Sequence, residues 1–509
     1  MLSKSILTVF TITCCSKLLG FLREIIFINK VGVGAQTDTY FAAFSIIEFL
    51  ILFCGFNAMK SVTTSTISKE ISLNRNPNDF FSSMSFVLFA YGGIIALCLL
   101  FFTEFIVGIF YPGFQLELKN LTTQNIQILS FLILAKGMYF VWGAALGVYK
   151  QFVAQNISIL IINTLLIATI LFVAPDNIIK ILCVVNVLGY SAATLFEYFS
   201  LKRSKIHFKF VKIGNIRRHI KKILKVGLPL LFVTAAFSLA GAVDKAIASF
   251  FGNGIVTALN ISYTLCFFSV SLFLVPLSNV LFPHFSKLYY QNDMVGLRRI
   301  YNSSQIVIFV IFSPIALSLA VFSKEILNSL VLSNKISSEQ MLLSLSFLKL
   351  YSISIIFNVV YNLNALVFQS SQKNKLVGYI GVVAYLINMI FSITLSKIIG
   401  PEGIAIGTIC CFMFFMLSSQ ALLWKEFGLQ ISKYALKKIA FVLAASIGIA
   451  LSVKQMSVWW QIAGDGILPN LTYLAANISL YIGIYTIIIS LAFRINIKDF
   501  YRRTIKKKT

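Results

Sequence analysis

The chain has 509 residues, of which 58% are hydrophobic and only 12% are charged, and its mean hydropathy is +0.88. A soluble domain is about half apolar and about one quarter charged, so this composition excludes a soluble globular protein and predicts an all-α polytopic membrane protein. The net charge of +26 would favour nucleic-acid binding in a soluble protein, but cytoplasmic loops of membrane proteins are themselves rich in Lys and Arg. We therefore expect no nucleic-acid partner.

Apolar segments long enough to cross a bilayer follow one another along the whole chain. A span takes about 20 apolar residues, and on this criterion we expect about fourteen transmembrane helices. They lie near residues 4–29, 37–66, 80–111, 122–149, 155–174, 178–201, 226–251, 255–284, 302–332, 339–370, 376–396, 402–424, 433–453 and 470–493.

The distribution of Lys and Arg predicts the orientation of these spans. If both termini are cytoplasmic, most basic residues fall on the inner side, above all in the segment 202–225 and in the tail after residue 493. Basic and apolar residues alternate in 202–225, so we expect this linker to lie against anionic membrane lipid. Both termini are predicted to be cytoplasmic in a multi-pass protein of the bacterial inner membrane.

The basic linker also divides the chain into similar halves. When the second half is aligned on the first, Glu24 meets Asp244, Gly32-x-Gly34 meets Gly252-x-Gly254, and Thr37 meets Thr257. Such agreement in one register indicates an internal repeat and two pseudo-symmetric lobes. We expect an N-terminal lobe at 1–201, the linker at 202–225, a C-terminal lobe at 226–426, and an extra helix pair with a basic tail at 427–509.

Charged residues in the first two spans indicate a polar cavity. A charge at the centre of a membrane helix costs roughly 2.5–3.5 kcal/mol on insertion scales, so these side chains are expected to face water or a partner. Cations suit phosphate, and Arg offers a bidentate fork. Internal salt bridges between helices are the structural alternative. We expect substrate-binding roles for Lys17, Arg23, Asp38 and Glu48, and cavity or gating roles for Glu24 and Lys60.

A second embedded acid, Asp244, lies in the seventh expected span. With the polar side chains of Asn388 and Thr408 it forms a candidate cation site, and the alternative is an ion pair with the neighbouring Lys245. The eight Cys and three His residues lack the spacing of metal ligands, so we expect no metal site and no cofactor, apart from a coupling ion such as Na+ or H+. We find no catalytic motif and expect a monomeric protein that is not an enzyme.

The first hairpin resembles the MurJ/MviN family of lipid II flippases, within the multidrug/oligosaccharidyl-lipid/polysaccharide exporter superfamily. The resemblance rests on Ser16-Lys17-Leu18-Leu19-Gly20-Phe21-Leu22-Arg23-Glu24 and on Gly32-x-Gly34-x-x-Thr37-Asp38. It implies that Lys17, Arg23 and Asp38 line a central cavity that receives the pyrophosphate and sugar of a polyprenyl-linked precursor. Two further cavity arginines of the family correspond here to Ile51 and Thr264.

The resemblance implies a flippase that moves a polyprenyl-diphosphate-linked saccharide, above all the peptidoglycan precursor lipid II, from the inner to the outer leaflet by alternating access. Three alternatives stay open on the sequence alone. They are an exporter of another lipid-linked oligosaccharide, a multidrug/cation antiporter of the same superfamily, and a membrane polymerase of lipid-linked sugars. Short outer loops argue against the polymerase.

Overall fold

The computed structural model describes residues 2–73, 75–203, 235–331, 335–457 and 467–493. Within these ranges the chain is helical and contains no strand, so the all-α class is confirmed. Most of the expected cytoplasmic linker, the start of the seventh expected span and the basic tail lie outside the described residues. The α-helices are α1 (Leu2–Val31), α2 (Ala35–Phe53), α3 (Phe56–Ser72), α4 (Asn78–Phe110), α5 (Leu116–Val148), α6 (Phe152–Phe172), α7 (Ile178–Arg203), α9 (Ile255–Tyr290), α10 (Met294–Val321), α11 (Ser323–Leu330), α12 (Ser338–Ser370), α13 (Asn374–Ile399), α14 (Glu402–Phe427), α15 (Lys433–Met456) and α16 (Ile467–Ala492).

Twelve helices of the described chain are long and apolar enough to cross a membrane. The remaining two expected spans correspond to α1, which carries several charges, and to the helical residues 235–248. The polytopic membrane architecture predicted from the apolar segments is therefore confirmed.

Two expected spans are interrupted, which corrects the prediction. The span expected at 37–66 divides into α2 and α3 because Gly55 adopts the left-handed conformation, with φ 80° and ψ 20°. The span expected at 302–332 divides into α10 and α11 at Phe322. A left-handed residue cannot continue a right-handed helix, and Gly adopts this conformation without a steric penalty.

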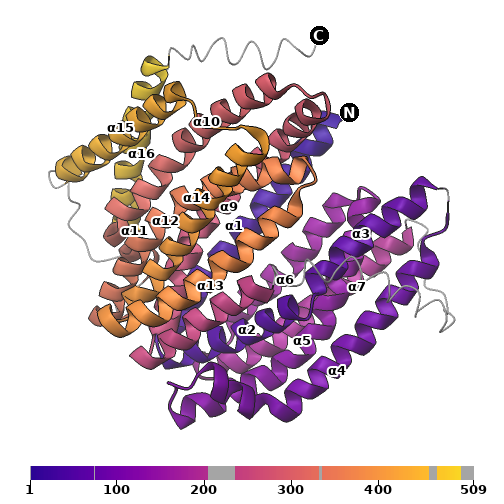
Figure 1. Cartoon of the computed structure of the whole chain (residues 1–509). Coiled ribbons are helices and arrows are strands. Elements are labelled where there is room, and N and C mark those ends of the chain that lie inside the picture. Colours follow the sequence, from indigo (N-terminus) through magenta and orange to yellow (C-terminus); the bar gives the residue numbers. More distant parts are fainter. Residues whose placement is uncertain (1, 74, 204–234, 332–334, 458–466, 494–509) are drawn as a thin grey trace. The chain divides into compact units, whose positions relative to one another are not determined.

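The chain forms two compact units by its internal contacts. Unit 1 comprises Met1–Asn260, Lys335–Gln340 and Gly381–Gly407, and unit 2 comprises the rest. In unit 1, α5 packs against α2, α3, α4 and α7, while α1 packs along α6 (Figure 1). The side chains of Ile126, Leu129 and Ile133 on α5 are fully buried, so α5 lies in the core of this bundle. The lobe boundaries expected from the repeat stay a prediction.

Unit 2 contains the C-terminal helix pair, whose presence is confirmed. Helices α15 and α16 pack on each other and on α10 and α11 (Figure 1). The Tyr485 hydroxyl donates to the Val310 carbonyl oxygen at 2.9 Å, and the Lys454 ammonium forms an ion pair with Glu325. These polar contacts attach the pair to α10 and α11 within the apolar packing.

Candidate functional site

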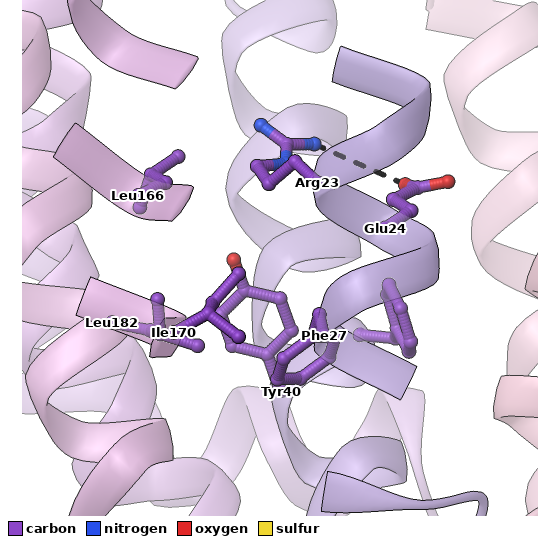
Figure 2. A pocket seen from close by; sticks show the side chains of 8 residues that line it. Arg23, Glu24, Phe27, Tyr40, Leu166, Ile170 and Leu182 are labelled. Carbon is purple, nitrogen blue, oxygen red and sulfur yellow. Dashed lines mark ion pairs between the residues drawn. The ribbon is translucent and has the colours of Figure 1, made fainter. Parts of the chain in front are cut away.

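A pocket inside unit 1 brings together residues of four helices. Apolar side chains of α1, α2, α6 and α7 form most of its wall, and Arg23 and Glu24 of α1 supply the charges. Figure 2 shows these two residues toward one end of the pocket, with Phe27 and Tyr40 toward the other. The full set of lining residues is Arg23, Glu24, Phe27, Tyr40, Phe41, Leu166, Ile170 and Leu182.

Arg23 is half-buried and makes two polar contacts. Its Nη1 donates to the Asn163 Oδ1 atom of α6 at 3.1 Å, and its Nη2 lies 4.0 Å from the Glu24 Oε1 atom. An Arg side chain has five N–H donors, so these contacts leave several for a ligand. A guanidinium held by one amide and one partly exposed carboxylate keeps its positive charge available to an anion.

The packing of α1 against α6 sets the position of Arg23. The Thr13 hydroxyl donates to the Asn156 Oδ1 atom at 3.0 Å, about two helical turns before Gly20. A Cβ atom at Gly20 would lie 3.7 Å from the Asn163 amide, so the glycine allows this Asn to pack close to the α1 backbone. Asn163 is buried and also donates to the Ile159 carbonyl oxygen.

Glu48 of α2 forms an ion pair with Lys136 of α5. Lys136 is nearly buried, with 8% of its side chain exposed, whereas 39% of the Glu48 side chain is exposed. The Lys136 ammonium also lies 5.2 Å from the centre of the Tyr190 ring. Lys245, in the helical residues 235–248, interacts electrostatically with both Glu24 and Glu48. The Glu48–Lys136 pair is an internal salt bridge between helices, the arrangement that the structural alternative describes, and the expected substrate role of Glu48 stays a prediction.

Asp38 occupies a different environment from the other embedded acids. Its side chain is fully buried and accepts hydrogen bonds at the start of α9, from the Gly254 amide at 2.5 Å and the Thr257 amide at 2.8 Å. The Thr257 hydroxyl donates to it as well, at 2.5 Å. The carboxylate therefore caps a helix N-terminus far away in the sequence, where backbone amides and the helix dipole both favour an anion. In this conformation the Asp38 carboxylate is hydrogen-bonded to Gly254 and Thr257 of the same chain. Its expected contact with substrate stays a prediction.

The Asp38 contacts place the two Gly-x-Gly turns at the same end of unit 1. Gly32 and Gly252 occupy equivalent positions in the aligned halves, and both have positive φ values, 97° and 111°. The second glycines of the two turns differ in conformation. Gly34 is extended, with φ 173°, whereas Gly254 has a positive φ of 87°. The Val33 amide next to the first turn donates to the Lys335 carbonyl oxygen at 2.7 Å.

The remaining cations of the expected site lie on α1 and α3. Lys17 lies on α1 and is half-buried, and Lys60 lies on α3 and is exposed. The Lys60 ammonium is 6.0 Å from the centre of the Phe140 ring. Their expected roles stay predictions.

Two of the three residues of the candidate cation site, Asp244 and Asn388, lie together in unit 1. Asp244 forms hydrogen bonds with Asn388 and with Ser392, a residue that the sequence analysis did not select. Among the described atoms, the Asp244 Oδ1 atom has no hydrogen-bond partner. Thr408 is a buried residue of unit 2, so the cation site as a whole stays a prediction.

Sequence reasoning missed Asn163, Tyr40 and Asn186, which order the Arg23 pocket. The Asn186 amide donates to the Tyr40 hydroxyl at 3.1 Å and so holds this ring in the pocket wall. Asn163 and Asn186 are single amides within apolar helices, a pattern that marks interhelical hydrogen bonding in membranes. The sequence therefore indicated that Asn163 and Asn186 form hydrogen bonds between helices, but it did not indicate which residue each amide contacts.

Comparison with known proteins agrees with this architecture. A family model described as "Lipid II flippase MurJ" matches residues 28–464. A "Probable lipid II flippase MurJ" of Haemophilus influenzae is 22% identical over 400 residues, which are 75% of this chain and 78% of the relative. A "Lipid II flippase MurJ" of Burkholderia cenocepacia is 23% identical over 425 residues, with 80% of each chain covered.

Solved structures show the same fold. A lipid II flippase MurJ in an inward closed conformation superposes with a TM-score of 0.78 at 20% identity, covering 96% of this chain and 99% of that one. An inward-facing multidrug resistance transporter of the MATE family gives a TM-score of 0.69 at 13% identity, covering 84% and 95%.

An all-helical polytopic bundle with an internal, partly charged pocket defines a polytopic membrane protein of the fold that the MurJ and MATE structures share. The match over most of its length shows that the chain belongs to the MurJ family of lipid II flippases. It is accordingly a multi-pass protein of the bacterial inner membrane.

Proposed function

We propose that this chain moves lipid II, a polyprenyl-diphosphate-linked saccharide, from the inner to the outer leaflet by alternating access. The observation that carries the proposal is the Arg23 guanidinium, held in a pocket by Asn163 and Glu24 with several donors still available. A diphosphate that crosses the membrane loses its hydration, and fixed cations compensate for that loss. The curated relatives that carry the name lipid II flippase support this substrate class.

Lys17 on the same helix is proposed to add positive charge beside Arg23, while Glu24 and Glu48 provide counter-charges that keep the site from holding the anion too firmly. Glu48 is partly exposed although it is paired with Lys136, so it remains accessible to a polar head group. Release of the head group requires a site of moderate affinity, and alternating signs of charge supply it.

Asp38 is proposed to act in alternating access. Its three hydrogen bonds to Gly254 and Thr257 hold the start of α2 against the start of α9. A state that is open at this end must replace these bonds with water, so the contact is a two-state element that the transport cycle biases. The chain is further proposed to work as a monomer, with both termini cytoplasmic and the linker 202–225 on anionic lipid. A reporter fused at Lys212 tests the topology, and an extracytoplasmic signal there contradicts it.

Complementation of a strain depleted of its own flippase tests the proposed function. The unmodified chain is expected to restore growth and to relieve the accumulation of lipid II, and Arg23→Ala is expected to fail at an equal membrane level. Arg23→Lys should restore growth only in part, because the bidentate fork is lost. Arg75→Ala is the matched control, since Arg75 is exposed in the segment between α3 and α4. Full growth with Arg23→Ala contradicts the proposal.

A further inference from the structure

Glu197 is a buried acid on α7 that the transport site does not include. Its side chain has no exposed surface, and its Oε1 atom accepts a hydrogen bond from the Ser158 hydroxyl of α6 at 3.0 Å. The Oε2 atom is buried and has no hydrogen-bond partner among the described residues. An ionised carboxylate in such a place costs several kcal/mol unless a cation or further donors compensate it.

No such compensation is present around Glu197 in the described part of the chain. Each of the four ion pairs there involves other acids. Lys60 of α3 has a favourable electrostatic effect on Glu197, but Lys60 is exposed, and no ion pair joins it to Glu197 among the described residues. From α5 the titratable group that faces Glu197 is Tyr139, and from α6 the neighbours are the neutral Ser158 and Gln155.

The packing leaves room for the carboxyl group itself. A Cβ atom at Gly143 of α5 would lie 3.2 Å from the Glu197 Oε1 atom, 3.6 Å from Oε2 and 3.5 Å from the Gln155 Nε2 atom. The glycine therefore forms one wall of a small space that the carboxyl group fills. A neutral carboxylic acid fits this space without any additional partner.

The hydrogen bonds around Ser158 are better satisfied when Glu197 carries a proton. The single Ser158 hydroxyl proton has three acceptors within reach, namely the Gln155 carbonyl oxygen at 2.7 Å, Glu197 at 3.0 Å and the Tyr139 hydroxyl at 3.4 Å. A serine hydroxyl is one donor and two acceptors. If Glu197 is protonated it can donate to Ser158, and the Ser158 proton is then free for the Gln155 carbonyl oxygen.

A chain of side chains also connects Glu197 with the charged network of the transport site. Tyr139, which contacts Ser158, packs edge-on against Tyr190 at 5.6 Å between ring centres. Tyr190 lies against Lys136, the partner of Glu48. Packing contacts therefore run from Glu197 to a residue of the expected substrate site.

We propose that Glu197 is a proton-binding site of the N-terminal helices, that it is occupied in this conformation at neutral pH, and that its proton is exchanged during the transport cycle. The ligand is one proton, which converts the carboxylate into a carboxylic acid with no other bond changed. The first two parts stand on the geometry alone, whereas the exchange during transport rests on the proposed function.

Infrared spectroscopy of the full-length protein in lipid nanodiscs tests the site directly. The difference spectrum between the unmodified chain and Glu197→Gln should contain a protonated carboxyl band at neutral pH. Glu117→Gln, which removes an exposed carboxyl group from α5, should not change that band. If Glu197→Gln removes only carboxylate bands, the proposal is overturned. If added Na+ converts the acid band into a carboxylate band, the site takes a metal cation and the proton proposal is likewise overturned.

Ser158→Ala gives a second variant, which keeps the test decisive if Glu197→Gln does not fold. Both forms of Glu197 lose their bond to Ser158 in this variant, but the ionised form loses a charge-assisted bond, which is roughly twice as strong as a neutral one. The midpoint of the acid band should therefore move to higher pH by about one unit, or tenfold in proton affinity. An unchanged midpoint contradicts the assigned geometry.

Transport assays in liposomes separate the exchange step from the site. Flipping by Glu197→Gln is expected to be slower and no longer dependent on pH, because the Gln side chain neither releases nor binds a proton. If the acid band is present but the pH profile of flipping is unchanged, the exchange is contradicted while the site stands. If Arg23→Ala also flips normally, the proposed function fails, and the infrared result still decides the proton site.

Discussion

Arg23 of α1 and Asn163 of α6 are joined by a hydrogen bond of 3.1 Å between the guanidinium and the amide oxygen. Asn163 is buried, and its Nδ2 atom donates to the Ile159 carbonyl oxygen, so the amide cannot rotate without losing a bond. The amide oxygen is therefore a fixed acceptor that orients Arg23 toward the pocket.

This relationship predicts the effect of Asn163→Ala. The guanidinium should lose its preferred orientation, and transport should fall about tenfold, since a hydrogen bond to a charged group is worth about 1.5 kcal/mol. Initial rates of flipping in liposomes measure the effect. Asn156→Ala is the matched control, because Asn156 joins the same two helices through Thr13 without contacting Arg23. Equal losses in both variants would reduce Asn163 to a packing residue.

Asp38→Asn tests the cap on α9. The Asn side chain keeps one acceptor but turns an amide donor toward the Gly254 or Thr257 amide, so the contact should weaken by about 1–3 kcal/mol. We expect faster cysteine labelling at the Gly-x-Gly turns, because the open state gains population. Asp79→Asn, at an exposed position in the first turn of α4, should leave labelling unchanged. If Asp38→Asn is labelled at the same rate as the unmodified chain, a gating role for Asp38 is contradicted.

Gly55→Ala tests the interruption between α2 and α3. The left-handed conformation costs an L-residue about 1–2 kcal/mol, so the variant should unfold at a lower temperature in detergent. Gly93→Ala is a suitable control, since Gly93 lies inside α4 and a Cβ atom there meets only one side-chain atom at 3.9 Å. Higher stability in Gly55→Ala would mean that α2 and α3 prefer to form one continuous helix.

The sequence alone predicted the membrane class, the approximate spans and the charged first hairpin, because these depend on local composition. Arg23 and Asp38 were recognisable as charges within apolar segments, and this does not depend on how the helices pack. Their partners were not, since Asn163 and Thr257 come close only through tertiary packing of distant helices. The same limit applies to Glu197, which lies near the end of an apolar segment, where a surface position was equally compatible with the pattern.

The ion pair between Glu48 and Lys136 predicts unequal effects of its two neutral variants. Only 8% of the Lys136 side chain is exposed, against 39% of Glu48. Removing the acid leaves a buried cation without its partner, whereas removing the cation leaves an acid that already reaches solvent. Glu48→Gln should therefore destabilise the protein more than Lys136→Met, because leaving a fully buried charge without its partner costs about 3–5 kcal/mol.

Thermal unfolding in detergent measures both variants and the double variant Glu48→Gln/Lys136→Met. The double variant should be more stable than Glu48→Gln alone, because it no longer buries an unpaired charge. Transport should respond in a different order. If Glu48 contacts the head group, flipping should be lost in Glu48→Gln and in the double variant, yet retained in part in Lys136→Met. Equal transport in all three variants would assign the pair to stability alone.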